Sequence, residues 1–146
     1  MVKSNILEYI TEEEVRKADK RALQITDYPI SVENLTEMLS KDSKNNFTLI
    51  RSFFKWICNN IRYTPGSKCI DIPSIMDTKQ ASSEGFANLF EQMCRLSNIT
   101  VIKLNSFIKN YSFVLHYRNI EDKNSKHFWN AVLINNKYHY VDCSWG

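Results

Sequence analysis

Residues 81–90 read ASSEGFANLF, and this stretch decides the fold because it predicts a helix that needs a second layer to cover it. From Ser83 onward the apolar side chains recur at three- and four-residue steps, which places them on one face: Phe86, Leu89, Phe90, Met93 and Cys94. By itself, a serine at a helix start is an ordinary N-cap, with Glu84 in the first turn. The stretch gains a chemical meaning only through residues farther along the chain.

Two later stretches supply a base and an acid: HFWNAV at 127–132 and VDCSWG at 141–146. Together with the helix start they resemble the transglutaminase-like, papain-related superfamily. In that family a cysteine in C-E-G-Y-A-N-L-F, a histidine in H-A-W-N-A-V and an aspartate in D-x-T-W-G form a catalytic triad. The resemblance implies that Ser83 lies at the position of the nucleophile, His127 at that of the base and Asp142 at that of the orienting acid. It also implies a cleft around them with these candidate residues: Trp56, Glu84, Trp129, Asn130 and Trp145.

The upstream sequence extends the resemblance. Residues 50–63 read IRSFFKWICNNIRY, similar to the pattern R-A-I-x-x-W-I-x-x-N-I-x-Y of the kyphoscoliosis peptidase and hillarin branch. Three other positions depart from the family: Ala81 and Ser106 stand where glycines are usual, and Phe128 replaces an alanine. Serine at position 83 is the departure with the largest consequence, because its alkoxide is far more basic than a thiolate and cannot form a papain-like ion pair at neutral pH.

Length and composition limit the class of protein. The chain has 146 residues, 43% of them hydrophobic, which predicts one domain over residues 1–146. The formal charge is +3, and no basic cluster is interleaved with aromatic residues, so a nucleic-acid partner is not expected.

No apolar run reaches the length of a membrane span, and residues 1–10 carry charges where a signal peptide needs an apolar stretch. We therefore expect a cytoplasmic protein without a membrane partner. Because family relatives continue past D-x-x-W-G, we also expect a piece of a longer protein.

The four cysteines match neither a disulfide scaffold nor a C-x-x-C metal site, and we expect no cofactor or metal. Cys58 and Cys94 fall within helical patterns and should be buried. Cys143 adjoins Asp142, so on a strand its side chain would point to the opposite face and could not replace Ser83.

The order of the expected elements indicates an α+β domain with a papain-like, transglutaminase-like core, in which N-terminal helices and a central helix pack on an antiparallel sheet. The expected helices cover residues 11 to about 21, 31 to 39, 47 to 62, and 83 onward. A linker at 40–46 and a loop from 64 to about 80 separate them. The expected strands are 99–104, 111–117, 127–134 and 137–143, which are rich in β-branched and aromatic residues.

The turn Asn135-Asn136 predicts how the acid meets the base. Asparagine tolerates the positive φ of a tight hairpin, and a two-residue loop places Trp129 opposite Asp142. His127 is then a diagonal neighbour of Asp142. We expect their face to cover the helix, together with the apolar set Ala131, Leu133, Tyr138 and Tyr140.

Three functions remain open at this point. The chain is a catalytically silent family member that acts as a protein-binding or scaffold domain, or it is a thiol acyltransferase or peptidase in which Ser83 is an engineered replacement of cysteine. The third is a working Ser-His-Asp hydrolase. The resemblance implies a protein glutamine or a peptide bond as the substrate class, and a protein or peptide partner of cytoskeletal type.

Overall fold

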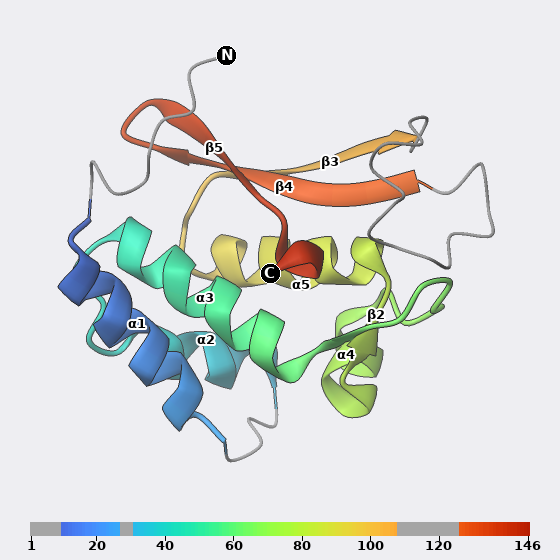
Figure 1. Ribbon diagram of the computed structural model, residues 1–146, viewed down its shortest axis with the longest axis horizontal. Helices are drawn as coiled ribbons and strands as arrows, with labels where there is room; N and C mark the ends of the chain where they lie inside the picture. Colours follow the sequence, from blue (N-terminus) through green and yellow to red (C-terminus); the bar gives the residue numbers. More distant parts are fainter. Residues whose placement is uncertain (1–9, 27–30, 108–125) are drawn as a thin grey trace.

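The computed structural model describes residues 10–26, 31–107 and 126–146, which form a sheet covered by helices (Figure 1). The sheet is three-stranded and antiparallel, in the order β3-β4-β5: Val101–Phe107, Lys126–Ile134 and Lys137–Val141. The central helix is α5, Ser83–Leu96, which lies against β3 and β4. The predicted α+β class, with a central helix on an antiparallel sheet, is confirmed.

The N-terminal helices begin where the sequence places side-chain caps. They are α1, Glu12–Gln24, α2, Val32–Ser40, and α3, Asn46–Asn60. Each follows a residue whose side-chain oxygen accepts a first-turn backbone N–H: Thr11, Ser31 and Asn45. Such caps each stabilise a helix by about 1 kcal/mol. The predicted ends were less accurate, since α1 runs three residues beyond Arg21 and α3 stops before Ile61 turns to extended backbone.

The core lies between α3, α5 and the sheet. Its largest side chains are almost fully buried: Phe53, Trp56, Ile57, Leu89, Phe90, Met93 and Val132. Burying a side chain of this size contributes roughly 1.5–3 kcal/mol relative to leaving it in water. On the surface, Arg51 of α3 donates to both carboxylate oxygens of Asp19 in α1, at 2.6 and 2.9 Å. Apolar burial thus holds the layers together, and a bidentate ion pair fixes how α1 lies on α3.

The segment before α5 is more ordered than the predicted loop. It contains α4, Ile72–Thr78, and β1, Arg62–Tyr63, which pairs in parallel with β2, Gln80–Ala81. The prediction failed because Pro73 suggested a break, whereas a proline fits the first turn of a helix. The β1–β2 pairing ties the entry of α5 to the end of α3 and so fixes where Ser83 begins.

Gly85 allows α5 to lie this close to the preceding segment. A Cβ at this position would lie 2.5 Å from the backbone oxygen of Cys69 and 2.7 Å from the Cβ of Ala81. Only glycine therefore fits in the first turn of α5 without displacing the backbone at Cys69.

The hairpin register is as predicted. Asn135 and Asn136 have φ of 50° and 61°, and Ile134 pairs with Lys137. The paired ladder ends at Asn130 and Val141, so Trp129 and Asp142 do not continue it. The predicted strand at 111–117 lies outside the described residues.

The predicted helix-covering face was wrong. Tyr138 and Tyr140 are 52% and 60% exposed, whereas Val132 and Ile134 are buried and the Asn130 side chain donates to the Ala87 carbonyl of α5. β4 is apolar on both faces, so alternation could not identify the buried one, and the two tyrosines of β5 lie on the exposed face.

Candidate active site

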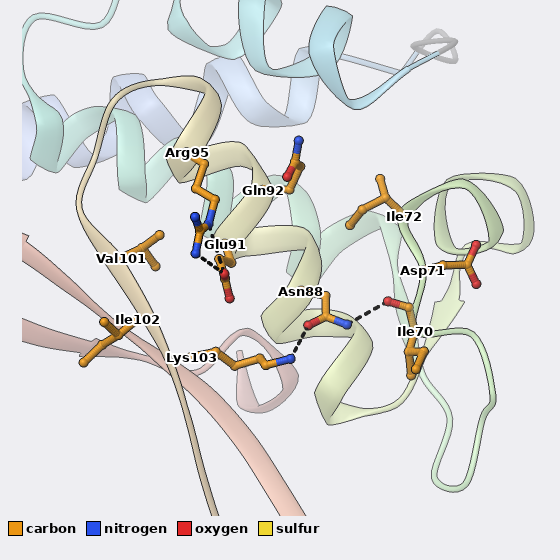
Figure 2. Close-up of a pocket in the computed structure, with 10 residues that line it drawn as sticks. All are labelled: Ile70, Asp71, Ile72, Asn88, Glu91, Gln92, Arg95, Val101, Ile102 and Lys103. Carbon is orange, nitrogen blue, oxygen red and sulfur yellow. Dashed lines mark hydrogen bonds and ion pairs between the residues drawn. The ribbon is translucent and has the colours of Figure 1, made fainter.

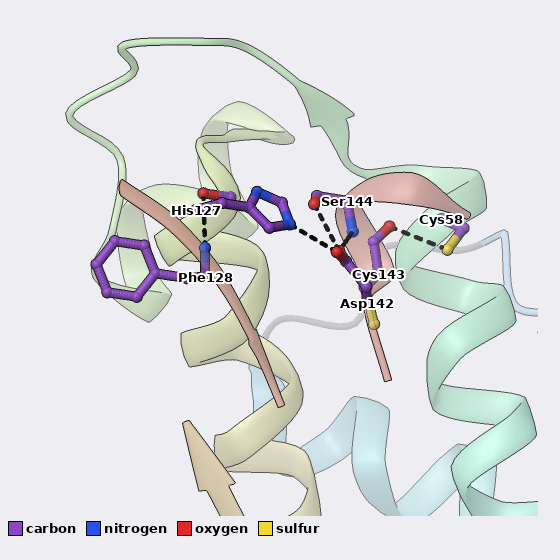
Figure 3. A network of polar contacts seen from close by, with 7 residues as sticks. Cys58, His127, Phe128, Asp142, Cys143 and Ser144 are labelled. Atoms are coloured by element: carbon purple, nitrogen blue, oxygen red, sulfur yellow. Dashed lines mark hydrogen bonds and ion pairs between the residues drawn. The ribbon is translucent and has the colours of Figure 1, made fainter. Parts of the chain in front are cut away.

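The candidate site lies where β5 ends and the chain leaves the sheet. Asp142 follows β5 and caps the short 3₁₀ helix η2, Cys143–Trp145. Its Oδ2 lies 2.6 Å from His127 Nε2 (Figure 3). Its Oδ1 accepts hydrogen bonds from the backbone N–H of Ser144 at 3.1 Å and from the Ser144 hydroxyl at 2.7 Å. The carboxylate is therefore held on both oxygens, and it holds the imidazole in turn.

Ser83 meets the same corner from the helix side. It is the first residue of α5 and is 6% exposed, and its Oγ accepts the backbone N–H of Phe128 at 3.3 Å. That N–H points toward β5, but β5 has already ended, so it is free for the serine. The N-cap residue is Ser82, which makes no side-chain capping bond. The Ser83 hydroxyl thus contacts β4 instead of capping its own helix.

Ser83 reaches the backbone of β4 beside His127, but its hydroxyl is not hydrogen-bonded to the imidazole. Ser83 contacts the backbone of the residue that follows His127, and within the described residues no hydrogen bond joins the two side chains. Because Nε2 is directed at Asp142, Nδ1 is the imidazole nitrogen left for proton exchange with a nucleophile. In apo structures such contacts are often loose and tighten with substrate.

Two tryptophans fix the imidazole plane. The ring of Trp129 stacks on His127 with centroids 5.9 Å apart, and Trp145 meets it edge-on at 5.5 Å. Trp145 is 42% exposed, so one wall of the site is open to solvent. The pair restricts rotation of the ring and leaves an apolar surface beside the polar group.

The remaining predicted cleft residues differ in their positions. Glu84 lies 3.7 Å from the ammonium group of Lys103, beside the nucleophile position, and Asn130 is buried under the site. Trp56 lies in the core, 1% exposed, with its indole N–H directed to the Ile25 carbonyl. The structure therefore brings Glu84, Trp129, Asn130 and Trp145 to the site and leaves Trp56 in the core.

Two contributors were missed from the sequence. The backbone N–H of Phe128 has no sequence signal, because its availability depends on where β5 ends. Ser144 did have a sequence signal, since it stands where the family pattern D-x-T-W-G places a threonine, and serine and threonine both carry a hydroxyl.

The cysteines differ in chemical character. A hydrogen bond with Cys143, helped by the charges of Lys55 and Arg51, lowers the pKa of the Cys58 thiol. Burial raises the pKa of Cys94 to about 12, and burial also raises the pKa of Cys143. Cys143 lies in η2 and not on a strand, so the strand argument against it does not apply. Its burial removes it from the reactive thiols instead.

Metal-binding and membrane-spanning features are absent from the described ranges. Residues 10–26, 31–107 and 126–146 contain no group of three or more His, Cys, Asp or Glu side chains that could hold a metal ion. In the same ranges, no helix has the length and apolar character needed to cross a bilayer.

Comparison with known proteins agrees with this geometry. The model of the transglutaminase-like superfamily matches residues 33–143, from α2 to the first residue of η2. The chain belongs to the transglutaminase-like superfamily. This match covers α5, β4 and Asp142, which carry the candidate site.

The curated relatives are longer proteins. The chain is 25% identical to mouse kyphoscoliosis peptidase over 138 residues, which is 89% of this chain and 20% of that protein. The human kyphoscoliosis peptidase is also 25% identical over 142 residues, covering 92% of this chain and 21% of that one. Lim and transglutaminase domain protein ltd-1 of Caenorhabditis elegans is 22% identical over 120 residues, covering 80% and 16%. The chain thus spans about a fifth of the length of the two peptidases.

Solved structures show the same fold. A crystal structure described as a cysteine protease of Cytophaga hutchinsonii has a TM-score of 0.57 at 14% identity, covering 94% of this chain and 44% of that one. A TGase crystal structure has a TM-score of 0.54 at 13% identity, covering 98% and 35%.

Proposed function

We propose that this chain is a transglutaminase-like domain in which Ser83, His127 and Asp142 form a version of the Cys-His-Asp triad with serine in place of cysteine. We also propose that it binds protein without turning over amides. The observation that carries the proposal is that Ser83, a 6% exposed residue at the start of α5, accepts the backbone N–H of Phe128, next to His127, whose imidazole is paired with the Asp142 carboxylate at 2.6 Å. The three side chains come from distant parts of the chain, which is the arrangement that a nucleophile, a base and an orienting acid need.

The chemistry of serine argues for silence at neutral pH. A cysteine in this position would lose its proton to His127, and the N-terminus of α5 would favour the thiolate. A serine hydroxyl keeps its proton, so attack on an amide carbonyl would require His127 to remove that proton as the new bond forms. Loss of a triad nucleophile typically costs several orders of magnitude in turnover and leaves roughly 10³-fold catalysis over water.

A second candidate is a thiol acyltransferase or peptidase in which serine has replaced a catalytic cysteine. The intact contact between His127 and Asp142, and the second anchor of Asp142 on Ser144, favour it. In such an enzyme the thiolate attacks a glutamine or peptide carbonyl, His127 protonates the departing amine, and water or an amine resolves the thioester.

The relatives and the composition support the proposed binding role and location. The mammalian relatives are named peptidases, and ltd-1 is named for LIM and transglutaminase domains. We infer a protein or peptide partner, of cytoskeletal type in a cytoplasmic setting, held on the open side of the site near Trp145.

Substitution of Ser83 by cysteine tests the proposal. We expect the unmodified chain to form no hydroxamate from benzyloxycarbonyl-glutaminyl-glycine and hydroxylamine. In the Ser83→Cys variant, the new thiol at position 83 should react with iodoacetamide at least about tenfold faster than Cys58, since a helix start and an imidazole both favour the thiolate. Peptide mapping by mass spectrometry follows each cysteine separately.

The His127→Ala change in the Ser83→Cys background is the matched control, and it should slow labelling of position 83 by raising the thiol pKa. Fast, His127-dependent labelling without turnover supports the binding domain, whereas hydroxamate formation by the variant supports the thiol enzyme. Slow labelling of position 83, at a rate that does not depend on His127, would rule out the triad. Turnover by the unmodified chain would contradict the proposal that it is catalytically silent.

A further inference from the structure

The outer edge of β3 is unpaired among the described strands. β3 lies at one end of the sheet, and the backbone N–H of Leu133 donates to the Thr100 carbonyl at 2.9 Å. Hydrogen-bonded and non-hydrogen-bonded positions alternate along an antiparallel ladder. The N–H and C=O groups of Val101, Lys103 and Asn105 therefore face away from β4, on the side where no strand of the described residues pairs with them.

A groove of about 540 Å³ runs beside this edge (Figure 2). Val101 and Ile102 line it from β3, with their side chains on opposite sides of the strand, Gln92 of α5 lies across from Val101, and Ile70 and Ile72 close the far side. Ile70 and Ile102 are 40% and 41% exposed. The groove thus offers apolar contact next to unpaired backbone groups.

The charges around the groove cancel. Its lining has two acids, Asp71 and Glu91, and two bases, Arg95 and Lys103. Arg95 pairs with Glu91 at 2.7 Å, and the ammonium group of Lys103 donates to Asn88 Oδ1 at 2.8 Å. Because the charges balance and both bases are already engaged, the lining does not favour a phosphate or another charged ligand, and it suits an uncharged one.

Lys103 does not protect the edge, although lysines often do so on edge strands. Its ammonium group is held by Asn88, lies 3.7 Å from Glu84 and sits 5.6 Å from the centre of the Phe128 ring. The side chain therefore lies over α5 and the start of β4, and does not itself cover the backbone edge.

We propose that the β3 edge and this groove bind an extended, uncharged peptide segment of a partner protein by adding it as a strand to the sheet. The peptide backbone pairs with Val101, Lys103 and Asn105, and every second side chain enters the groove. This surface lies beside α5 and is distinct from the group formed by Ser83, His127 and Asp142. It needs no nucleophile, so failure of the test below leaves the proposed function unchanged.

The test uses the seven-residue peptide acetyl-KTVTVTK-amide, which matches the length of β3, on the whole 146-residue chain. Its end lysines keep it soluble, and its central five residues are uncharged. We expect saturable shifts of the Val101, Lys103 and Asn105 amide signals in heteronuclear NMR, and slower hydrogen exchange at those amides. The same peptide with N-methyl groups on alternate residues cannot donate to the edge, and should bind at least about tenfold more weakly.

The groove is tested by Gln92→Trp, which fills it, with Gln24→Trp at the exposed end of α1 as the matched control. Gln92→Trp should weaken binding at least about tenfold, and Gln24→Trp should leave it unchanged. Absence of binding at millimolar peptide, or binding that N-methylation leaves unchanged, would overturn the proposal. The peptide comparison uses the unmodified chain, so it decides the outcome even if Gln92→Trp fails to fold.

Discussion

Asp142 uses both carboxylate oxygens, and each has a different task. Oδ2 contacts the imidazole of His127, while Oδ1 is held by the N–H and hydroxyl of Ser144. A carboxylate that could rotate would present its oxygen to Nε2 only part of the time. We therefore expect Ser144 to be a positioning residue, which acts on His127 through Asp142 if the proposed triad operates.

We predict that Ser144→Ala in the Ser83→Cys background slows iodoacetamide labelling of position 83 by roughly threefold to tenfold, because the carboxylate loses one of its hydrogen bonds. Ser144→Thr keeps the hydroxyl and should label at the original rate. The pH profile of labelling separates positioning from general damage, since only a positioning role shifts the apparent pKa of the thiol upward. Equal labelling rates in the Ser144→Ala and Ser144→Thr variants would rule out a positioning role for Ser144.

The residues of the site were predictable to the extent that each carries its own chemistry. Ser83, His127 and Asp142 stand in recognisable stretches, and the structure brings all three to one corner. The Phe128 N–H could not be predicted, because a backbone group becomes available only through the path of another strand. The aromatic side chain of Trp56 beside the apolar stripe of its helix indicates core packing more often than a cleft, and its burial decides for the core.

At the scale of the element, local turn chemistry was the most reliable guide. The Asn135-Asn136 turn fixes the register of β4 and β5, and so brings Asp142 within reach of His127. α4 escaped prediction because a seven-residue helix has too little periodicity to outweigh a proline. The covered face of β4 could not be predicted either, since its alternate residues are apolar on both sides and only α5 distinguishes them.

We predict that Asn136→Gly raises the free energy of unfolding by about 0.5 kcal/mol, because glycine adopts the observed φ of 61° without the cost of a side chain. Asn136→Val should lower it by about 1–2 kcal/mol, since a β-branched residue resists the left-handed region. Urea unfolding followed by circular dichroism measures both. Similar losses in the two variants would mean that the turn does not hold position 136 at positive φ.

At the scale of the whole molecule, the site depends on three separately anchored pieces. The β1–β2 pairing fixes the start of α5, the hairpin fixes β4, and η2 packs against α3 and α5. The end of η2 lies very close to α3 at Gly146, because a Cβ there would overlap the Cys58 thiol and the ring of Phe54. Because these pieces pack around one core, unfolding of the core would also disrupt the geometry of the site. The ionisation of a thiol buried in that core therefore reports on the stability of the fold.

We predict that the chain loses stability at alkaline pH partly through Cys94. Burial raises its folded-state pKa to about 12 from 9.0, so the folded chain retains this proton while the unfolded chain releases it. The contribution is fully present below pH 9.0 and declines as the pH rises toward about 12, by roughly 1 kcal/mol per pH unit between these values. Cys143, whose pKa burial also raises, acts in the same direction.

Urea unfolding of the chain and of Cys94→Ala at about pH 7 and about pH 10 measures this effect, because tyrosines and lysines titrate alike in both proteins. The alanine variant should be less stable at neutral pH, since it leaves a small cavity in a fully buried position. Its loss of stability between the two pH values should nevertheless be smaller by about 1 kcal/mol. A parallel decline in both proteins would mean that Cys94 ionises as readily in the folded chain as in the unfolded one, and that water reaches the core between α5 and the sheet.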